Sequence, residues 1–134
     1  MKIRRKLAAD ARGIAATEFA IVAPVLILLI VGMAQLGILF MANAGLRNAL
    51  AAGARYATIY PMPSDTALQQ RIRDTRFGLK DSQMQTPTIV HGIVNGANYV
   101  DISVTYSVPM NFVFFQLSPV QLTQTRRAFV TPGS

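Results

Sequence analysis

The feature that most constrains this chain is a long run without a charged residue, which extends from Phe19 to Leu46. Most positions from Phe19 to Met41 are apolar. A helix over these positions would be about 34 Å long at a rise of 1.5 Å per residue, and the hydrocarbon core of a bilayer is about 30 Å thick. The run therefore predicts a single membrane-spanning helix over about residues 19–41.

Composition fits one membrane segment beside one small domain. The chain has 134 residues, of which 51% are hydrophobic and 14% charged, whereas soluble domains carry about 25% charged residues. The net charge of +7 comes mostly from five basic residues near the N-terminus: Lys2, Arg4, Arg5, Lys6 and Arg12. The other charges have mixed signs, so nucleic acid is not an expected partner. The positive-inside bias predicts a cytoplasmic N-terminus, with residues beyond about 45 outside.

A removable secretory signal is the main alternative to a permanent span. Ala42, Asn43 and Ala44 have the small-x-small pattern of a signal-peptidase site. Cleavage there would release a soluble secreted binding domain that lacks the apolar segment. Length argues against this alternative, because the apolar part of a signal peptide has about 7–15 residues and this run is longer.

Two residues just before the apolar run are informative: Gly13 and, five residues later, the carboxylate of Glu18. A carboxylate costs at least a few kcal/mol when it moves toward the membrane centre, so a passive anchor has no use for Glu18. The order basic leader, Gly13, Ile14, Glu18 and Phe19 resembles a type IV prepilin processing site. The resemblance implies that a prepilin peptidase cuts after Gly13, where the missing Cβ lets the backbone approach closely.

Cleavage after Gly13 would create a cationic amine on Ile14, about one helical turn from Glu18. The resemblance implies that Glu18 neutralises the amine of a neighbouring subunit during assembly. Each charge would then be tolerated in an apolar setting only with its partner present. The simpler alternative is that Glu18 lies in the headgroup zone without a specific role.

A longer pattern extends this resemblance to a particular group. Residues 12–24, followed by Gly32, Gly37 and the segment 51–57, resemble the TadE and TadF group of pilin-like proteins, which belong to tight adherence (Tad) systems that build Flp pili. Major Flp pilins are shorter and usually carry tyrosine after the glutamate, whereas this chain has Phe19 and a sizeable outer domain. The resemblance therefore implies a minor, pseudopilin-like subunit.

The resemblance also implies partners and a location. The partners are the prepilin peptidase, the major Flp pilin, other minor pilins, the inner-membrane pilus platform and the lipid bilayer. The location is the bacterial inner membrane, with possible display on the cell surface in the pilus, and the role is pilus assembly, initiation or surface adhesion. A single-span inner-membrane scaffold that never enters a filament is the alternative.

The span is expected to continue as an assembly helix over residues 14–57. Pro24 removes one backbone hydrogen bond and predicts a bend or local loosening. Beyond the membrane, Ala49, Gly53 and Ala57 repeat every four residues, and such small faces let helices approach closely. This stripe predicts packing on the chain's own domain or on other pilin helices, with a frayed stalk as the alternative.

Residues 58–134 predict a small extracytoplasmic α+β domain. A helix is expected from Ser64 or Asp65 to about Phe77, with Gly78 as its stop and with Leu68, Ile72 and Leu79 on its buried side. Three antiparallel strands are expected at 88–94, 99–108 and 120–130, with Asn95 and Gly96 as the first turn.

The connection from Pro109 to Pro119 is rich in aromatic residues, namely Phe112, Phe114 and Phe115. The favoured interpretation is a core plug beneath the sheet, because a three-stranded sheet must cover its apolar face. The alternative is an exposed patch for a partner subunit or the membrane surface.

Catalysis is not expected from this composition. The chain has no cysteine and one histidine, His91, whose simplest interpretation is an ordinary strand residue. The aspartates show no metal-ligand spacing, and no glycine-rich phosphate loop is present. We therefore expect no catalytic residue, metal, cofactor or small-molecule substrate.

Overall fold

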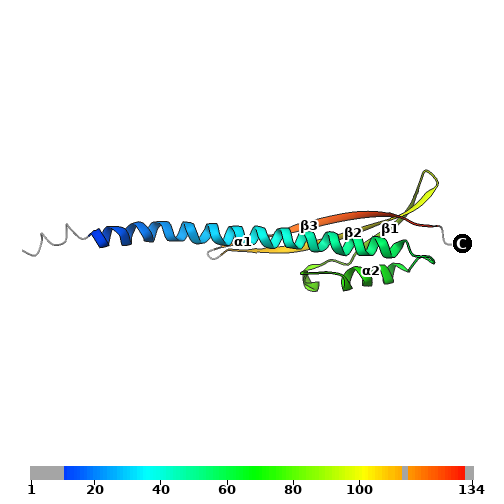
Figure 1. Ribbon diagram of the computed structural model, residues 1–134, viewed down its shortest axis with the longest axis horizontal. Coiled ribbons are helices and arrows are strands. Elements are labelled where there is room, and N and C mark those ends of the chain that lie inside the picture. The colour runs from blue at the N-terminus through cyan, green and yellow to red at the C-terminus, as the bar shows by residue number, and fades with distance from the viewer. Residues whose placement is uncertain (1–10, 113–114, 132–134) are drawn as a thin grey trace, which may run out of the picture.

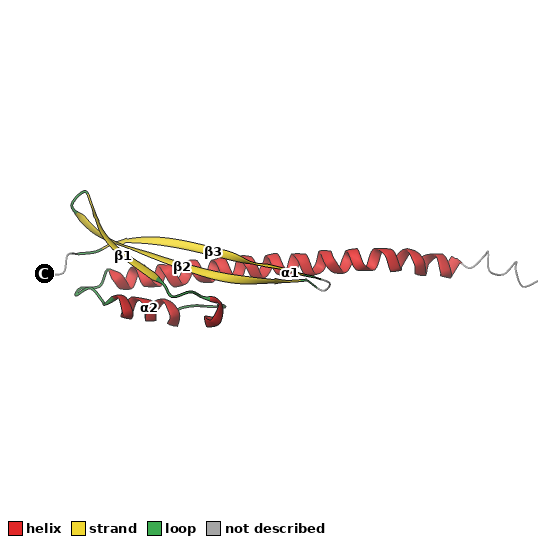
Figure 2. Ribbon diagram, turned by 180° about the vertical axis from the view of Figure 1, so that it is seen from behind, coloured by secondary structure: helices red, strands yellow, loops and turns green. Residues whose placement is uncertain are grey.

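The computed structural model describes residues 11–112 and 115–131, and most of the predicted leader, residues 1–10, lies outside them. The elements follow the order α1 (Ala11–Ala57), α2 (Asp65–Asp74), a short 3₁₀ helix η2 (Asp81–Gln83), β1 (Thr88–Val94), β2 (Ala97–Asn111) and β3 (Gln116–Phe129). Figure 1 shows an elongated molecule in which α1 is the shaft. The sheet and α2 lie along its C-terminal part (Figure 2). The predicted α+β class is confirmed.

α1 is one helix of 47 residues, about 70 Å long at 1.5 Å per residue. Its alanine and leucine content favours helix, and its apolar part has a mean hydropathy of 2.6, enough for a candidate membrane span. Pro24 lies inside the helix, and the ribbon continues through it without a break (Figure 1). The helix ends at Ala57, where the Thr58 hydroxyl donates to the carbonyl of Arg55.

The sheet is antiparallel in the order β1-β2-β3. β1 has the predicted bounds, and the turn to β2 places Asn95 and Gly96 at positive φ, as a tight hairpin turn requires. Alternate residues of β2 are buried against α1, which confirms the predicted period of two.

The predicted Pro109–Pro119 connection is wrong. β2 continues to Asn111 and β3 begins at Gln116, so most of the predicted connection belongs to the two strands. The pairing register shifts between Val108 and Met110, where Pro109 lies. A proline cannot donate to a sheet, and this irregularity lets the two strands pair beyond it.

The helix predicted to run to Phe77 ends earlier, at Asp74. Its start is as predicted, because the Ser64 hydroxyl accepts a hydrogen bond from the amide of Ala67. At its end the backbone amide and the hydroxyl of Thr75 both donate to the Arg71 carbonyl, which closes the last turn. The chain then reverses at Gly78, which has positive φ, and Leu79 enters the core.

The core lies between α1 and the sheet. Leu46 and Leu50 of α1 are fully buried with Val100, Ile102 and Val104 of β2. Leu68 and Ile72 of α2 are also buried, as predicted. One face of the C-terminal part of α1 therefore covers the apolar face of the sheet.

The favoured core-plug interpretation of the phenylalanine run is wrong for the residues that the structure describes. Phe112 is half-buried and stacks on Phe115, with ring centroids 4.9 Å apart, and 48% of Phe115 is exposed. Phe114 lies outside the described residues. The plug is not needed, because α1 already occupies the apolar face of the sheet.

Candidate membrane and assembly site

The predicted cleavage position lies at the exposed start of α1. An added Cβ on Gly13 would meet nothing within 4 Å, and Ile14 is also exposed. The Thr17 hydroxyl donates to the carbonyl of Ile14 at 2.8 Å and to that of Gly13 at 3.3 Å. The Gly13–Ile14 peptide is thus helical, and the described part of the outer domain leaves it open to a peptidase.

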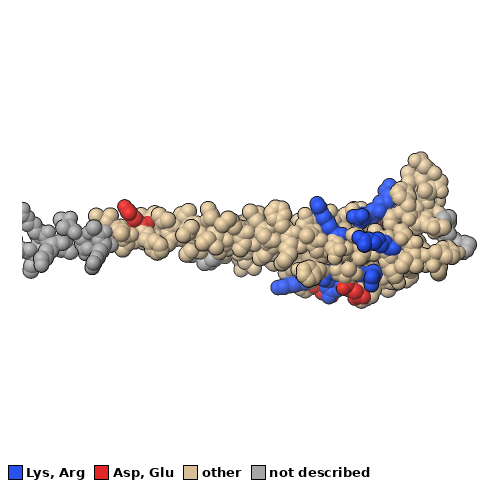
Figure 3. Space-filling view, in the orientation of Figure 1, with Lys and Arg blue, Asp and Glu red and all other residues tan. Residues whose placement is uncertain are grey.

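Glu18 and Phe19 also point away from the helix into open space, and 68% of Phe19 is exposed. Glu18 lies four residues after Ile14, on the same helical face. On the face shown in Figure 3, acidic atoms near the described start of α1 are followed by a long stretch without charged atoms. The basic side chains gather further along, over the part of the molecule where α2 lies beside α1 and the sheet.

The apolar stretch of α1 is mostly uncovered. From Ile21 to Phe40 most of its large side chains are exposed, and Pro24 is exposed too, whereas Leu28, Val31 and Leu39 are half-buried. Large apolar side chains rarely line such an exposed surface in water, so this stretch fits lipid or the helices of other subunits.

The small-residue stripe lies at the other end of α1, beneath the chain's own domain. Ala49 and Ala57 are buried, and a Cβ on Gly53 would lie 2.5 Å from Cγ1 of Ile72. A Cβ on Gly45 would likewise clash, here with the backbone carbonyl oxygen of Phe77. This face of α1 packs on α2 and the sheet and is therefore occupied within the monomer.

Sequence reasoning missed one contact inside the predicted span. The Gln35 side-chain amide donates to the Asn111 carbonyl at 2.6 Å, and a Cβ on Gly32 would lie 4.0 Å from the ring of Phe112. The end of the β2–β3 hairpin thus lies against the shaft. Gln35 has the only polar side chain from Phe19 to Met41, which is the signal that could have indicated this contact.

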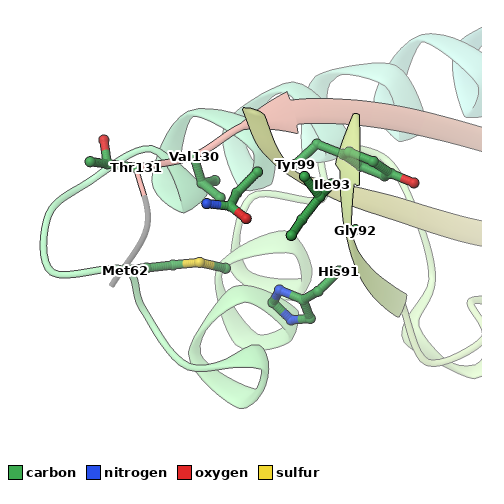
Figure 4. Close-up of a pocket in the computed structure, with 8 residues that line it drawn as sticks. Met62, His91, Gly92, Ile93, Tyr99, Val130 and Thr131 are labelled. Atoms are coloured by element: carbon green, nitrogen blue, oxygen red, sulfur yellow. The ribbon is translucent and has the colours of Figure 1, made fainter. Parts of the chain in front are cut away.

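A cavity of about 490 Å³ lies at the far end of the outer domain (Figure 4). Met62 and His91 point into it, and His91 Nε2 lies 2.8 Å from Asp65 Oδ1. Its other lining residues are Gly92, Ile93, Asn98, Tyr99, Val130 and Thr131. The cavity lacks the converging polar groups of a small-molecule site, and no metal-binding cluster occurs within residues 11–112 and 115–131.

Beside this cavity, the solvent face of the sheet carries an ion pair. Arg127 donates two hydrogen bonds to Asp101, at 2.7 and 2.8 Å, and its guanidinium lies 3.8 Å from the ring centre of Tyr99. The hydrogen bond from Arg127 lowers the pKa of Asp101 below its usual value. This pair joins β2 to β3 and is a stabilising contact rather than a reactive group.

Together, an exposed apolar helix long enough to span a membrane and an α+β domain built on its C-terminal end form the architecture of a pilin-like protein. Residues 13–55 match the family model described as TadE-like protein, which confirms the resemblance found in residues 12–57. The match, which is limited to residues 13–55, suggests involvement in the Tad pilus system, and the TadE-like family is not an enzyme family. No curated protein and no solved structure matches the chain.

Proposed function

We propose that this chain is a minor, pseudopilin-like subunit of a Tad pilus, anchored in the bacterial inner membrane and cut after Gly13 by a prepilin peptidase. The observation that carries the proposal is the open start of α1. Gly13, Ile14 and Glu18 are exposed there, at the head of a helix whose apolar stretch lies within the family match.

Cleavage would take place between Gly13 and Ile14, and assembly would then use the new Ile14 amine together with Glu18. The peptidase must open the first turn of α1, and a glycine lowers the cost of local unwinding. The new Ile14 amine and the Glu18 carboxylate are both costly in an apolar setting without a partner. Pairing between the amine of one subunit and the Glu18 of another sets the register of their helices.

The chain divides, in this proposal, into a leader (1–13), an assembly helix (14–57) and an outer domain (58–134). The basic leader stays in the cytoplasm by the positive-inside bias, and the outer domain lies outside. The exposed part of α1 contacts lipid first and then the major Flp pilin, other minor pilins or the inner-membrane platform. The outer domain serves as a cap or adaptor in assembly, initiation or adhesion rather than as a catalyst.

The alternative of a secreted domain released after Ala44 fits the contacts less well. α1 is continuous through this position, and Gly45 is buried beneath the Phe77 backbone. The Asn43 side chain accepts a hydrogen bond from Gln124 of β3 at 3.2 Å. A signal peptidase would have to cut inside the packed part of the helix.

Fractionation of cells that contain the complete pilus system tests the proposal. We expect the protein in sheared surface fibres as well as in the inner membrane. Glu18→Ala should reduce the amount in fibres at least about tenfold, because an unpaired buried charge costs more than 1.4 kcal/mol. Glu18→Asp, which keeps the charge, is the matched control and should retain more fibre incorporation.

Two results would count against the proposal. Protein found only in the inner membrane, in cells whose fibres form normally, would favour the scaffold alternative. Normal incorporation of Glu18→Ala would remove the paired-charge mechanism.

A further inference from the structure

The end of the β2–β3 hairpin lies beside the apolar part of α1, although the rest of the sheet packs on the C-terminal part of the helix. We call Met110, Asn111, Phe112, Phe115, Gln116 and Leu117 the hairpin tip. It contacts α1 through the hydrogen bond from Gln35 and through the ring of Phe112 beside Gly32. Figures 1 and 2 both show this end of the hairpin partway along the shaft, nearer the N-terminal end of α1 than α2 is.

The height of Gly32 on α1 fixes where the hairpin tip lies relative to a bilayer. If the hydrocarbon core begins at Phe19, Gly32 lies about 20 Å above that boundary, which is about 10 Å below the outer boundary of a 30 Å core. If the core begins at Gly13, Gly32 lies about 28 Å up and reaches the outer boundary. Both placements put the hairpin tip within the outer leaflet or at its edge.

The chemistry of the hairpin tip suits this position. No charged residue occurs from Ile102 to Thr125. Phe115 and Leu117 are 48% and 53% exposed, and they enlarge the apolar surface of α1 instead of facing a core. The nearest basic residue along α1 is Arg47, a further four turns or so toward the outer domain.

Several backbone polar groups of the hairpin tip are hydrogen-bonded, as a position with little water requires. Asn111 pairs with Gln116, and the Phe112 amide donates to the Phe115 carbonyl at 2.9 Å. Gln35 supplies a donor to the Asn111 carbonyl. These bonds reduce the cost of placing non-helical backbone near lipid, which otherwise reaches several kcal/mol for each unpaired group.

We propose that the hairpin tip enters the outer leaflet of the bilayer that α1 spans, with Phe112 and Phe115 at the boundary between acyl chains and headgroups. The two placements put Gly32 between the outer boundary of the core and about 10 Å below it, which overlaps the depth of about 5–10 Å at which an amphipathic element typically buries its apolar face at a membrane surface. The outer domain is then held at the membrane by two elements. This inference rests on the membrane span in the proposed function but not on cleavage or pilus assembly.

Tryptophan fluorescence in reconstituted vesicles tests the inference, because the chain has no tryptophan. The full-length chain carries one substitution at a time: Phe115→Trp or Leu117→Trp in the hairpin tip, Phe129→Trp at the other end of β3, or Leu29→Trp in the span. All four positions are exposed, so each variant should fold. Phosphatidylcholine brominated on its acyl chains, near the headgroup or near the terminal methyl, is the quencher.

We expect several-fold stronger quenching at 115 and 117 than at 129, and headgroup-proximal bromine should act more strongly there than terminal bromine. Quenching at 115 and 117 as weak as at 129, with strong quenching at 29, would overturn the inference while keeping the span. That result would assign the hairpin tip to a neighbouring protein. Weak quenching at all four positions would overturn the span and the inference together.

Discussion

Gly53 is a residue of α1 whose size is limited by a buried side chain of α2. An added Cβ would lie 2.5 Å from Cγ1 and 2.9 Å from Cδ1 of Ile72, which is fully buried. Alanine favours helix by about 1 kcal/mol over glycine, but forcing extra volume into a packed core costs about 1–3 kcal/mol. The packing cost should win at this position.

We therefore expect Gly53→Ala to lower the free energy of unfolding by about 1 kcal/mol, measured by thermal or denaturant unfolding in detergent. Gly37→Ala is the matched control in the same helix, because its Cβ would meet nothing within 4 Å. It should leave stability unchanged or raise it. Equal effects of the two substitutions would show that Ile72 does not limit the size of residue 53.

The ion pair between Asp101 and Arg127 predicts a pH dependence of stability. The folded-state pKa of Asp101 lies below its usual value of 3.8, so the pair stabilises the fold above that pH. Its contribution is lost as the pH falls through the folded-state pKa. The melting temperature of wild type should exceed that of Asp101→Asn near pH 7, and the difference should shrink below about pH 4. A difference that grows on acidification would contradict this sign.

Residues that act through local spacing could be predicted from the sequence, whereas residues that act through distant contacts could not. The order of Gly13, Glu18 and Phe19 led to the resemblance that the family match supports. Gln35 was missed, because its partner Asn111 is 76 residues away in the chain. Its isolation among apolar residues marks it as unusual but does not identify the partner.

At the scale of elements, the alternation of apolar and polar residues and the Asn95–Gly96 turn located the strands. The lengths of the strands depended on tertiary contacts. β2 and β3 extend past Pro109 because a register shift absorbs it and because α1 lies beside the lengthened hairpin. The phenylalanine run was placed in the core because the sheet needed a cover, and the sequence does not show that α1 already supplies one. α2 ends at Asp74, where the amide and the hydroxyl of Thr75 both donate to the Arg71 carbonyl, and the hydrophobic period does not reveal this end.

The position of the β2–β3 hairpin should depend on Gln35. Replacing its amide with a side chain of similar size in Gln35→Met removes the donor to the Asn111 carbonyl, a loss of about 1 kcal/mol. We expect faster hydrogen exchange in residues 108–112 and 115–117, with exchange at Val100 to Val104 unchanged. Met33→Leu, an exposed position on the same helix, is the control. Unchanged exchange in Gln35→Met would contradict docking through this bond.

At the scale of the whole molecule, one helix serves two environments. Its C-terminal part is the covering layer of the outer domain, where Leu46, Ala49 and Leu50 are buried. Most of the apolar side chains of its N-terminal part are exposed, and the β2–β3 hairpin contacts it near Gly32 and Gln35. A rigid connection between the two follows, because no loop interrupts α1 from Ala11 to Ala57. Whatever fixes the N-terminal part in a membrane or fibre therefore also orients the outer domain.

The most direct test of this account is the N-terminal sequence of the mature protein, isolated from cells that contain its prepilin peptidase. The account predicts a start at Ile14, and Gly13→Leu should keep the leader attached because a bulky residue hinders close approach of the peptidase. A start at Met1, in cells whose major pilin is processed, would contradict the account. A start at Gly45 would contradict it equally, since the membrane helix would then be a discarded signal.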